Sequence, residues 1–177
     1  MMGDSLTYDW DRFCRPFFKG HGLVGRGIGG ETSAQMLMRF APDVVELKPQ
    51  AVHLMAGTND LAALRRPYDG DETRKNIDAM AVLARDNGIR VILASVPPAT
   101  GFRWGRPAQE ALRSLNGWIN DLCARNGYTY CDYWFVLRGT GDGLKPQYRQ
   151  DRVHLNAAGY NAMGPVLLAA IDAALKR

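Results

Sequence analysis

The residues that could do chemistry lie at opposite ends of the sequence. Ser5 stands in the stretch GDSL, and an aspartate and a histidine three positions apart, Asp151 and His154, stand in the stretch DRVH. A serine hydroxyl is a weak nucleophile unless a base takes its proton, and histidine has the pKa suited to that task near neutral pH. Asp151 can reach the other ring nitrogen of His154 through a tight turn and fix its tautomer. The pattern therefore predicts a Ser5–His154–Asp151 triad.

Acyl transfer also needs hydrogen-bond donors that face the oxyanion of the transition state. The chain offers three candidates: the backbone N–H of Ser5, the backbone N–H of Gly30 in the stretch GIGGETS, and the side-chain amide of Asn59 in the stretch GTND. We expect these three donors to converge on one point beside the Ser5 hydroxyl and to form an oxyanion hole.

The elements that must position these residues alternate along the chain. Short apolar runs predict strands, and the runs over residues 51–57 and 89–96 are nearly continuous, which is typical of buried parallel strands. Further strands are predicted over residues 128–134 and within residues 22–30. Helical patterns fill the intervals, over residues 32–40, 71–87, 107–126 and 157–175.

Glycine directly follows two of the predicted helices. Gly88 and Gly127 each stand where a helix ends, since glycine accepts the left-handed backbone that stops a helix, and each leads into the next strand. Repeated strand–helix–strand units of this length predict a parallel sheet with helices on both faces. No linker, repeat or low-complexity stretch interrupts the pattern. Residues 1–177 are therefore predicted to form one α/β domain.

The candidate residues gather at one edge of this predicted sheet. Ser5 follows the first strand, Gly30 the second and Asn59 the third, and His154 comes beyond the fifth. Ligands of open parallel sheets bind beyond the carboxyl ends of the strands, so a site is expected there. The first strand is unusually short, since only two residues precede Gly3. Three explanations stay open: upstream residues have been removed, the strand is short, or another chain completes it.

These four blocks, in this order, resemble those of the SGNH or GDSL hydrolases, a branch of the serine esterases and lipases. GDSL matches the block that holds the nucleophile, and Gly30, Asn59 and the pair Asp151 and His154 match the other blocks across nearly the whole chain. The resemblance implies a three-layer α/β/α flavodoxin-like domain with five parallel strands in the order 2-1-3-4-5. It also implies a mechanism without cofactor or metal. Two features depart from the family: the apolar strand before GDS is truncated, and Leu155 stands where proline often follows the histidine.

Composition fits a soluble globular protein. Hydrophobic residues make up 46% and charged residues 23% of the chain, and the net charge of +4 is scattered, with no basic run beyond Arg65 and Arg66. A nucleic-acid partner is not expected, since its footprint is clustered positive charge. No stretch approaches the roughly 20 apolar residues of a membrane span. With no signal peptide in the chain as written, we expect a cytoplasmic location, or a periplasmic or secreted one if an upstream signal peptide has been removed.

Spacing disfavours two kinds of cofactor site. Cys14, Cys123 and Cys131 have no CxxC spacing, so neither a zinc site nor a disulfide framework is predicted, and at most one disulfide could join two of them. The stretch GRGIGG fits the dinucleotide pattern G-x-G-x-x-G. However, Glu46, the candidate acidic partner, precedes the next predicted strand instead of closing it.

Aromatic side chains near the predicted edge are candidates for the walls of a substrate pocket. They are Trp10, expected on the loop after Ser5, and Phe102 and Trp104, in the stretch after the fourth strand. The chain is small and has no large lid insertion, which favours short acyl groups. We therefore expect a small-molecule ester of the aryl, alkyl or O-acetyl carbohydrate type. Two alternative functions stay open: lysophospholipase or thioesterase specificity, and a non-catalytic carbohydrate- or lipid-binding module. The oligomeric state also stays open, and a homo-oligomer is possible.

Overall fold

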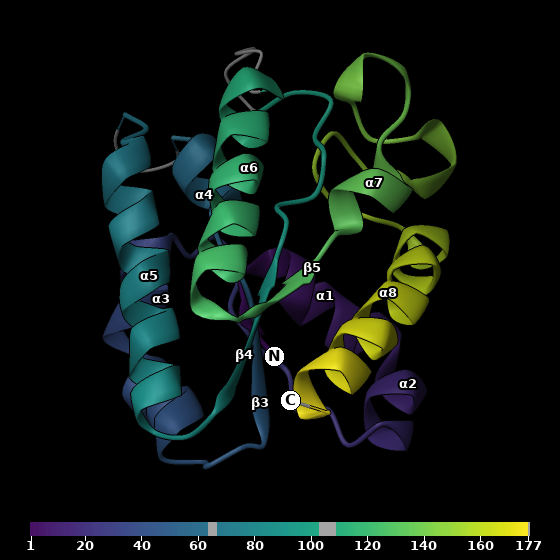
Figure 1. Ribbon diagram of the computed structural model, residues 1–177. Coiled ribbons are helices and arrows are strands. Elements are labelled where there is room, and N and C mark those ends of the chain that lie inside the picture. The colour runs from purple at the N-terminus through teal and green to yellow at the C-terminus, as the bar shows by residue number, and fades with distance from the viewer. Residues whose placement is uncertain (64–66, 103–108, 177) are drawn as a thin grey trace.

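The computed structural model describes residues 1–63, 67–102 and 109–176, and within them the chain forms one parallel sheet of five strands (Figure 1). The strands lie in the order β2-β1-β3-β4-β5, which confirms the order 2-1-3-4-5. Each neighbouring pair is parallel. Their bounds are Met2–Gly3 (β1), Arg26–Gly27 (β2), Ala51–Met55 (β3), Arg90–Ala94 (β4) and Thr129–Cys131 (β5).

The short strand β1 lies inside the sheet. Met2 and Gly3 pair with β2 on one side and with β3 on the other, and the Met2 side chain is fully buried. Residues that follow β1 therefore emerge from an interior strand at the carboxyl edge of the sheet. Ser5, two positions after β1, starts its helix there.

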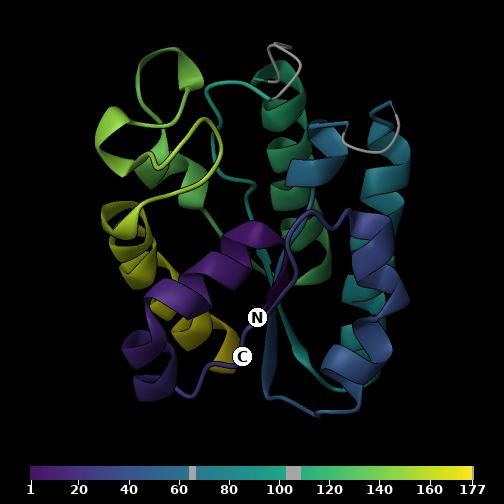
Figure 2. The same ribbon diagram turned by 180° about the vertical axis from the view of Figure 1, so that it is seen from behind.

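Helices cover both faces of the sheet, which gives the three-layer α/β/α arrangement that was predicted (Figures 1 and 2). One face carries α3 (Ser33–Met38), α5 (Gly70–Asp86) and α6 (Gln109–Asn126), and the other carries α1 (Ser5–Phe13), α2 (Arg15–Gly20) and α8 (Ala157–Leu175). A cluster of buried apolar side chains fills each side. The remaining described helical segments are α4 (Thr58–Leu61), α7 (Tyr133–Leu137), a π-helical turn (Ala41–Val45) and two 3-10 turns (Thr140–Asp142 and Pro146–Tyr148).

The strands predicted over 51–57 and 89–96 end two residues early, at Met55 and Ala94, and two other predicted elements also end earlier than expected. The strand predicted over 128–134 ends at Cys131, because the Asp132 side chain accepts the Phe135 backbone N–H and caps α7. The helix predicted over 32–40 ends at Met38, and the following π-helical turn contains a proline, which cannot donate a backbone hydrogen bond. Residues 107 and 108 of the helix predicted over 107–126 lie outside the described residues.

Residues 5–13 form a helix, so the prediction that Trp10 lies on a loop and lines the substrate pocket is wrong. Leu6 and Trp10 recur at helical spacing and are both 1% exposed. The Trp10 ring stacks on Tyr160 of α8 and on Phe17 of α2. Trp10 therefore belongs to the core between these three helices.

Helix α8 is long and apolar enough, by length and composition, to cross a membrane. Its Tyr160, Met163 and Leu167 side chains are fully buried against the fold, and 39% of its most apolar stretch is buried. The core helix of a globular domain meets the same criterion. The expectation that the chain has no membrane span therefore stays a prediction.

Gly27 has no room for a side chain, because α1 packs closely on β2. A Cβ atom at Gly27 would overlap the backbone nitrogen of Tyr8 and lie 2.7 Å from the carbonyl oxygen of Asp4. We expect Gly27→Ala to lower the free energy of unfolding by about 1–3 kcal/mol, since backbone atoms cannot rotate out of the way. Denaturant unfolding curves measure this.

Gly117→Ala is the matched control. Gly117 is exposed on α6, and a Cβ atom there meets nothing within 4 Å. We expect this variant to gain about 0.5–1 kcal/mol of stability, because alanine is the better helix former. A Gly27→Ala protein as stable as the wild type would contradict the close packing of α1 on β2.

Candidate active site

Ser5 is the first residue of α1, and a single residue, Asp4, separates it from β1. Asp4 caps the helix: its Oδ1 accepts the Leu6 backbone N–H at 2.9 Å, and its carbonyl oxygen accepts the Tyr8 N–H at 3.0 Å. Within the described part of the chain, the Ser5 backbone N–H has no acceptor, as is usual for the first residue of a helix. The nucleophile candidate therefore presents both a hydroxyl and a free N–H at the carboxyl edge of the sheet.

Ser5, His154 and Asp151 form a hydrogen-bonded chain. Ser5 Oγ lies 3.0 Å from His154 Nε2, and His154 Nδ1 lies 2.8 Å from Asp151 Oδ2. The other oxygen of Asp151 accepts the backbone N–H groups of Val153 and His154, each at 2.7 Å. The carbonyl oxygen of His154 accepts the Gln150 N–H at 2.9 Å. The structure thus brings the three residues together, and the aspartate itself holds the tight turn.

These contacts keep Asp151 charged. Partial burial acts to raise its pKa, but the backbone N–H groups of His154 and Val153 and the His154 ring outweigh that effect and lower the pKa below its ordinary value. Asp151 is therefore a carboxylate at neutral pH, and His154 Nδ1 donates to it. His154 Nε2 is then left as an acceptor for the Ser5 hydroxyl, which is the tautomer that a general base requires.

Gly30 supplies a second free backbone donor. Its φ of +78° lies in the left-handed region that favours glycine. Among the described residues its N–H has no acceptor, and Gly30 lines the same cavity as Ser5. Two unpaired backbone N–H groups, from segments 25 residues apart in sequence, therefore border one cavity.

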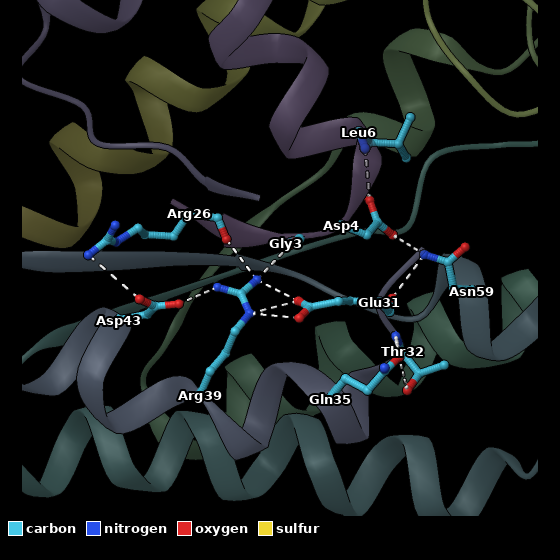
Figure 3. A network of polar contacts seen from close by, with 10 residues as sticks. All are labelled: Gly3, Asp4, Leu6, Arg26, Glu31, Thr32, Gln35, Arg39, Asp43 and Asn59. Atoms are coloured by element: carbon cyan, nitrogen blue, oxygen red, sulfur yellow. Dashed lines mark hydrogen bonds and ion pairs between the residues drawn. The ribbon is translucent and has the colours of Figure 1, made fainter. Parts of the chain in front are cut away.

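Asn59 lies on α4 and is buried, and its amide already has protein partners (Figure 3). Asn59 Nδ2 donates to the carbonyl oxygen of Glu31 at 2.9 Å and reaches Asp4 Oδ2 at 3.5 Å. The first distance is that of a good hydrogen bond, and the second is at the outer limit. One amide proton is therefore bound to the loop that follows Gly30, and the other is only weakly held.

Asp60, which follows Asn59 in α4, fixes this helix in place. Asp60 accepts the Ser33 backbone N–H at 2.9 Å, the Ser33 hydroxyl at 2.6 Å and the Thr73 hydroxyl at 3.3 Å. Ser33 begins α3 and Thr73 lies on α5, so this carboxylate ties α4 to both. Gly57 is the N-cap of α4 and has a φ of +125°, and a Cβ atom there would lie 2.7 Å from the Leu115 side chain.

Asp4 is a fully buried carboxyl group beside the nucleophile candidate. Burial raises its pKa to about 6, whereas the hydrogen bond from the Leu6 backbone N–H and the nearby Thr58 and His154 side chains act to lower it. Within residues 1–63, 67–102 and 109–176, no cationic group lies at ion-pair distance from Asp4. Its stabilisation comes from neutral donors, which is weaker than pairing with a cation.

A cavity of about 610 Å³ opens at this edge of the sheet. The residues that line it are Ser5, Gly30, Thr58, Asn59, Ala62, Gly101, Phe102, Asp151, Arg152, Val153 and His154. Phe102 thus lines the cavity, although its side chain is only 2% exposed, and its contact with a substrate stays a prediction. Trp10 does not line the cavity, and Trp104 lies outside the described residues.

Five lining residues were missed from the sequence: Thr58, Ala62, Gly101, Arg152 and Val153. Thr58, Arg152 and Val153 adjoin predicted site residues, so their place in the GTND and DRVH stretches was an available signal. Ala62 lies one helical turn after Asn59 because residues 58–61 form the helix α4, which was not predicted from the sequence. The backbone oxygen of Arg152 accepts the Thr100 N–H at 2.9 Å and joins the histidine loop to the loop after β4.

The described residues hold no group of three or more His, Cys, Asp or Glu side chains that could bind a metal ion. Within the described residues, Cys14, Cys123 and Cys131 form no disulfide with one another. A second cavity, of about 490 Å³, lies at the opposite end of the sheet beside Met1 and His53, and none of the predicted site residues lines it. The His53 ring there contacts the Tyr133 hydroxyl at 2.9 Å.

A parallel sheet of order 2-1-3-4-5 that carries a Ser–His–Asp chain at its carboxyl edge defines a serine hydrolase of the flavodoxin-like type. The chain belongs to the GDSL-like Lipase/Acylhydrolase family, whose model matches residues 1–162. The resemblance noted in the sequence is therefore confirmed, and the family is one of carboxylic ester hydrolases.

Individual relatives agree with this assignment. A GDSL-like lipase of known structure from Bacteroides thetaiotaomicron is 41% identical, with a TM-score of 0.93 over 97% of this chain and 85% of that one. A multidomain esterase from Ruminococcus flavefaciens is 27% identical over 98% of this chain, which spans only 22% of that relative. An acetylxylan esterase from Geobacillus stearothermophilus, 18% identical with a TM-score of 0.79 over 96% of this chain and 91% of that one, shares the fold.

The raised pKa of Asp4 predicts a pH-dependent loss of stability. Between its ordinary pKa of 3.8 and the folded value of about 6, the unfolded chain releases the Asp4 proton while the folded protein retains it. The wild type should therefore lose stability relative to Asp4→Asn as pH rises through this window, by up to about 3 kcal/mol, with no further relative change above it. Unfolding curves of both proteins at pH 4, 5, 6 and 7 test this. A stability difference that stays constant with pH would show that Asp4 titrates normally.

Proposed function

We propose that this protein is a serine esterase that hydrolyses carboxylic esters with short acyl groups through an acyl-enzyme intermediate. The observation that carries the proposal is the chain from Ser5 Oγ through His154 to Asp151, with distances of 3.0 and 2.8 Å, at the wall of a cavity of about 610 Å³. A nucleophile, a base and an acidic group that orients the base are the parts required for acyl transfer.

In the proposed reaction, Ser5 Oγ attacks the ester carbonyl carbon while His154 Nε2 takes the hydroxyl proton. His154 then donates that proton to the departing alcohol, which leaves an ester between the acyl group and Ser5. Water, deprotonated by the same His154, attacks this acyl-enzyme and releases the acid. Asp151 stabilises the imidazolium in both halves of the reaction.

The oxyanion is proposed to receive hydrogen bonds from the backbone N–H groups of Ser5 and Gly30 and from the side-chain amide of Asn59. The first two donors are unpaired within the described residues. The Asn59 amide proton that faces Asp4 at 3.5 Å is weakly held, so an oxyanion can accept it while the other proton stays on Glu31. Such donors are already in place before the reaction and need little rearrangement as charge develops.

The cavity supports short acyl chains. Among its described lining residues, only Ala62, Phe102 and Val153 carry apolar side chains. A long acyl chain needs extended apolar surface, whereas an acetyl or butyryl group fits a short apolar wall. Aryl, alkyl and O-acetyl carbohydrate esters all satisfy these requirements.

Hydrolysis of p-nitrophenyl esters with acyl chains of increasing length tests the proposal. We expect activity to be highest for the shortest esters, to fall for long ones, and to be unaffected by a chelator. Ser5→Ala should lose at least about 10³-fold in kcat while unfolding at the temperature of the wild type.

Each other outcome points to a different function. A maximum at long acyl chains would replace the short-chain specificity with lysophospholipase or thioesterase specificity. A folded wild type without activity on any ester would favour a non-catalytic binding module. Activity that survives in Ser5→Ala would exclude Ser5 as the nucleophile.

Asp151→Asn tests the tautomer argument separately. The asparagine oxygen can still accept the backbone N–H groups of Val153 and His154, so the turn should persist. Its amide would then face His154 Nδ1 and favour the tautomer with a proton on Nε2, which cannot accept the Ser5 proton. We expect kcat to fall by up to about 10⁴-fold with little change in melting temperature.

The control for this variant is Asp121→Asn, the same substitution at an exposed position of α6 outside the cavity. It should leave kcat unchanged. An Asp151→Asn enzyme with near-normal turnover would remove Asp151 from the mechanism.

A further inference from the structure

Arg39, outside the cavity, uses its whole guanidinium group to join separate segments (Figure 3). Nε donates to both carboxylate oxygens of Glu31, at 3.0 and 2.7 Å, and Nη1 donates to Asp43 at 2.5 Å. Nη2 donates to the backbone oxygens of Gly3 and Arg26, at 3.3 and 2.9 Å. The Arg39 side chain is only 15% exposed and that of Glu31 12%. Charge-assisted bonds in such a partly desolvated place are strong and directional.

The partners of Arg39 lead into the candidate active site from two directions. Gly3 ends β1 and stands two positions before Ser5, and Glu31 directly follows Gly30. The backbone oxygen of Glu31 accepts the Asn59 amide at 2.9 Å. Glu31 is therefore anchored through its side chain to Arg39 and through its backbone to Asn59.

The loop before Glu31 needs such an anchor. Gly29 and Gly30 give the segment after β2 a large backbone entropy in the unfolded chain, and glycine loses more freedom on folding than any other residue. A backbone donor is effective in catalysis only if its direction is fixed before the reaction. The ion pair between Glu31 and Arg39 ties the end of this loop to the C-terminal end of α3 and to β1, the strand that precedes Ser5.

We propose that Glu31, held by Arg39, is a positioning residue for the oxyanion hole: its side chain fixes the loop that presents the Gly30 N–H, and its backbone oxygen orients the Asn59 amide. This inference rests on the proposed esterase function. Glu31 touches neither substrate nor nucleophile in this role. It acts by holding two of the three oxyanion donors in place.

Asp43 provides a matched comparison. It pairs with the same guanidinium group and also lies 3.6 Å from Arg26, so it belongs to the same ion-pair network. However, it lies on the π-helical turn Ala41–Val45, away from the cavity-lining residues. A purely structural network predicts that loss of either carboxylate has the same effect. A positioning role for Glu31 predicts different effects on turnover.

The test compares Glu31→Gln with Asp43→Asn on the preferred p-nitrophenyl ester. We expect Glu31→Gln to lower kcat by about 10- to 100-fold, less than the 10²–10³-fold loss of a whole oxyanion donor, with KM changed by less than about threefold. Asp43→Asn should keep kcat within about twofold of the wild type. Both variants should lose a similar amount of stability, since both weaken the same network.

NMR order parameters of the Gly30 amide give a readout that does not depend on turnover. They should fall in Glu31→Gln and not in Asp43→Asn. Arg39→Lys keeps the charge but lacks the planar group that reaches both Glu31 and the Gly3 carbonyl, and it should reproduce the kcat loss if Glu31→Gln does not fold.

The outcomes separate this inference from the proposed function. An inactive wild type would contradict the esterase proposal. An active wild type with unchanged kcat in Glu31→Gln, or with equal kcat losses in Glu31→Gln and Asp43→Asn, would overturn the positioning role alone.

Discussion

The turn from β1 into α1, made by the single residue Asp4, is the constraint on which the rest of the site depends. The turn leaves no space on either side: a Cβ atom at Gly3 would overlap the Thr7 side chain, and one at Gly27 would overlap the backbone of α1. Because α1 begins at once, the Ser5 N–H stays free at the start of a helix. Because α1 lies against β2, the loop with Gly30 comes close to Ser5.

Asn59 contacts Asp4, which is buried, and Glu31, which is partly buried, and the protein stabilises these two carboxyl groups in different ways. Glu31 is paired with the Arg39 guanidinium, which makes it a fixed point for the oxyanion loop. Asp4 is held by neutral donors, and burial raises its pKa to about 6. A charge with a cationic partner adds rigidity, whereas a buried charge without one opposes folding. The charged form of Asp4 therefore opposes folding at the turn before Ser5, whereas the Glu31–Arg39 ion pair does not.

The aromatic core explains how residues from the two ends of the chain meet. Trp10 of α1 stacks on Tyr160 of α8, so these helices are packed together below the cavity. Ser5 stands at the start of α1, and His154 stands just before α8. Docking one helix on the other brings the hydroxyl to 3.0 Å from the imidazole. Trp10 thus serves the site through packing, although it does not line the pocket.

The sequence by itself determined the local features: the Asp151–His154 turn, the helix ends before Gly88 and Gly127, and the apolar strands. Each of these depends on residues a few positions apart, whose types and spacing fix the backbone directly. The strand order came from four family blocks and not from periodicity. Only the tertiary structure decided that Trp10 is a core residue, that Asn59 already bonds Glu31, and that Arg39 reaches Gly3, 36 residues away. Such contacts depend on how whole helices pack on the sheet, and no local pattern of residue types determines which residues distant in sequence will meet.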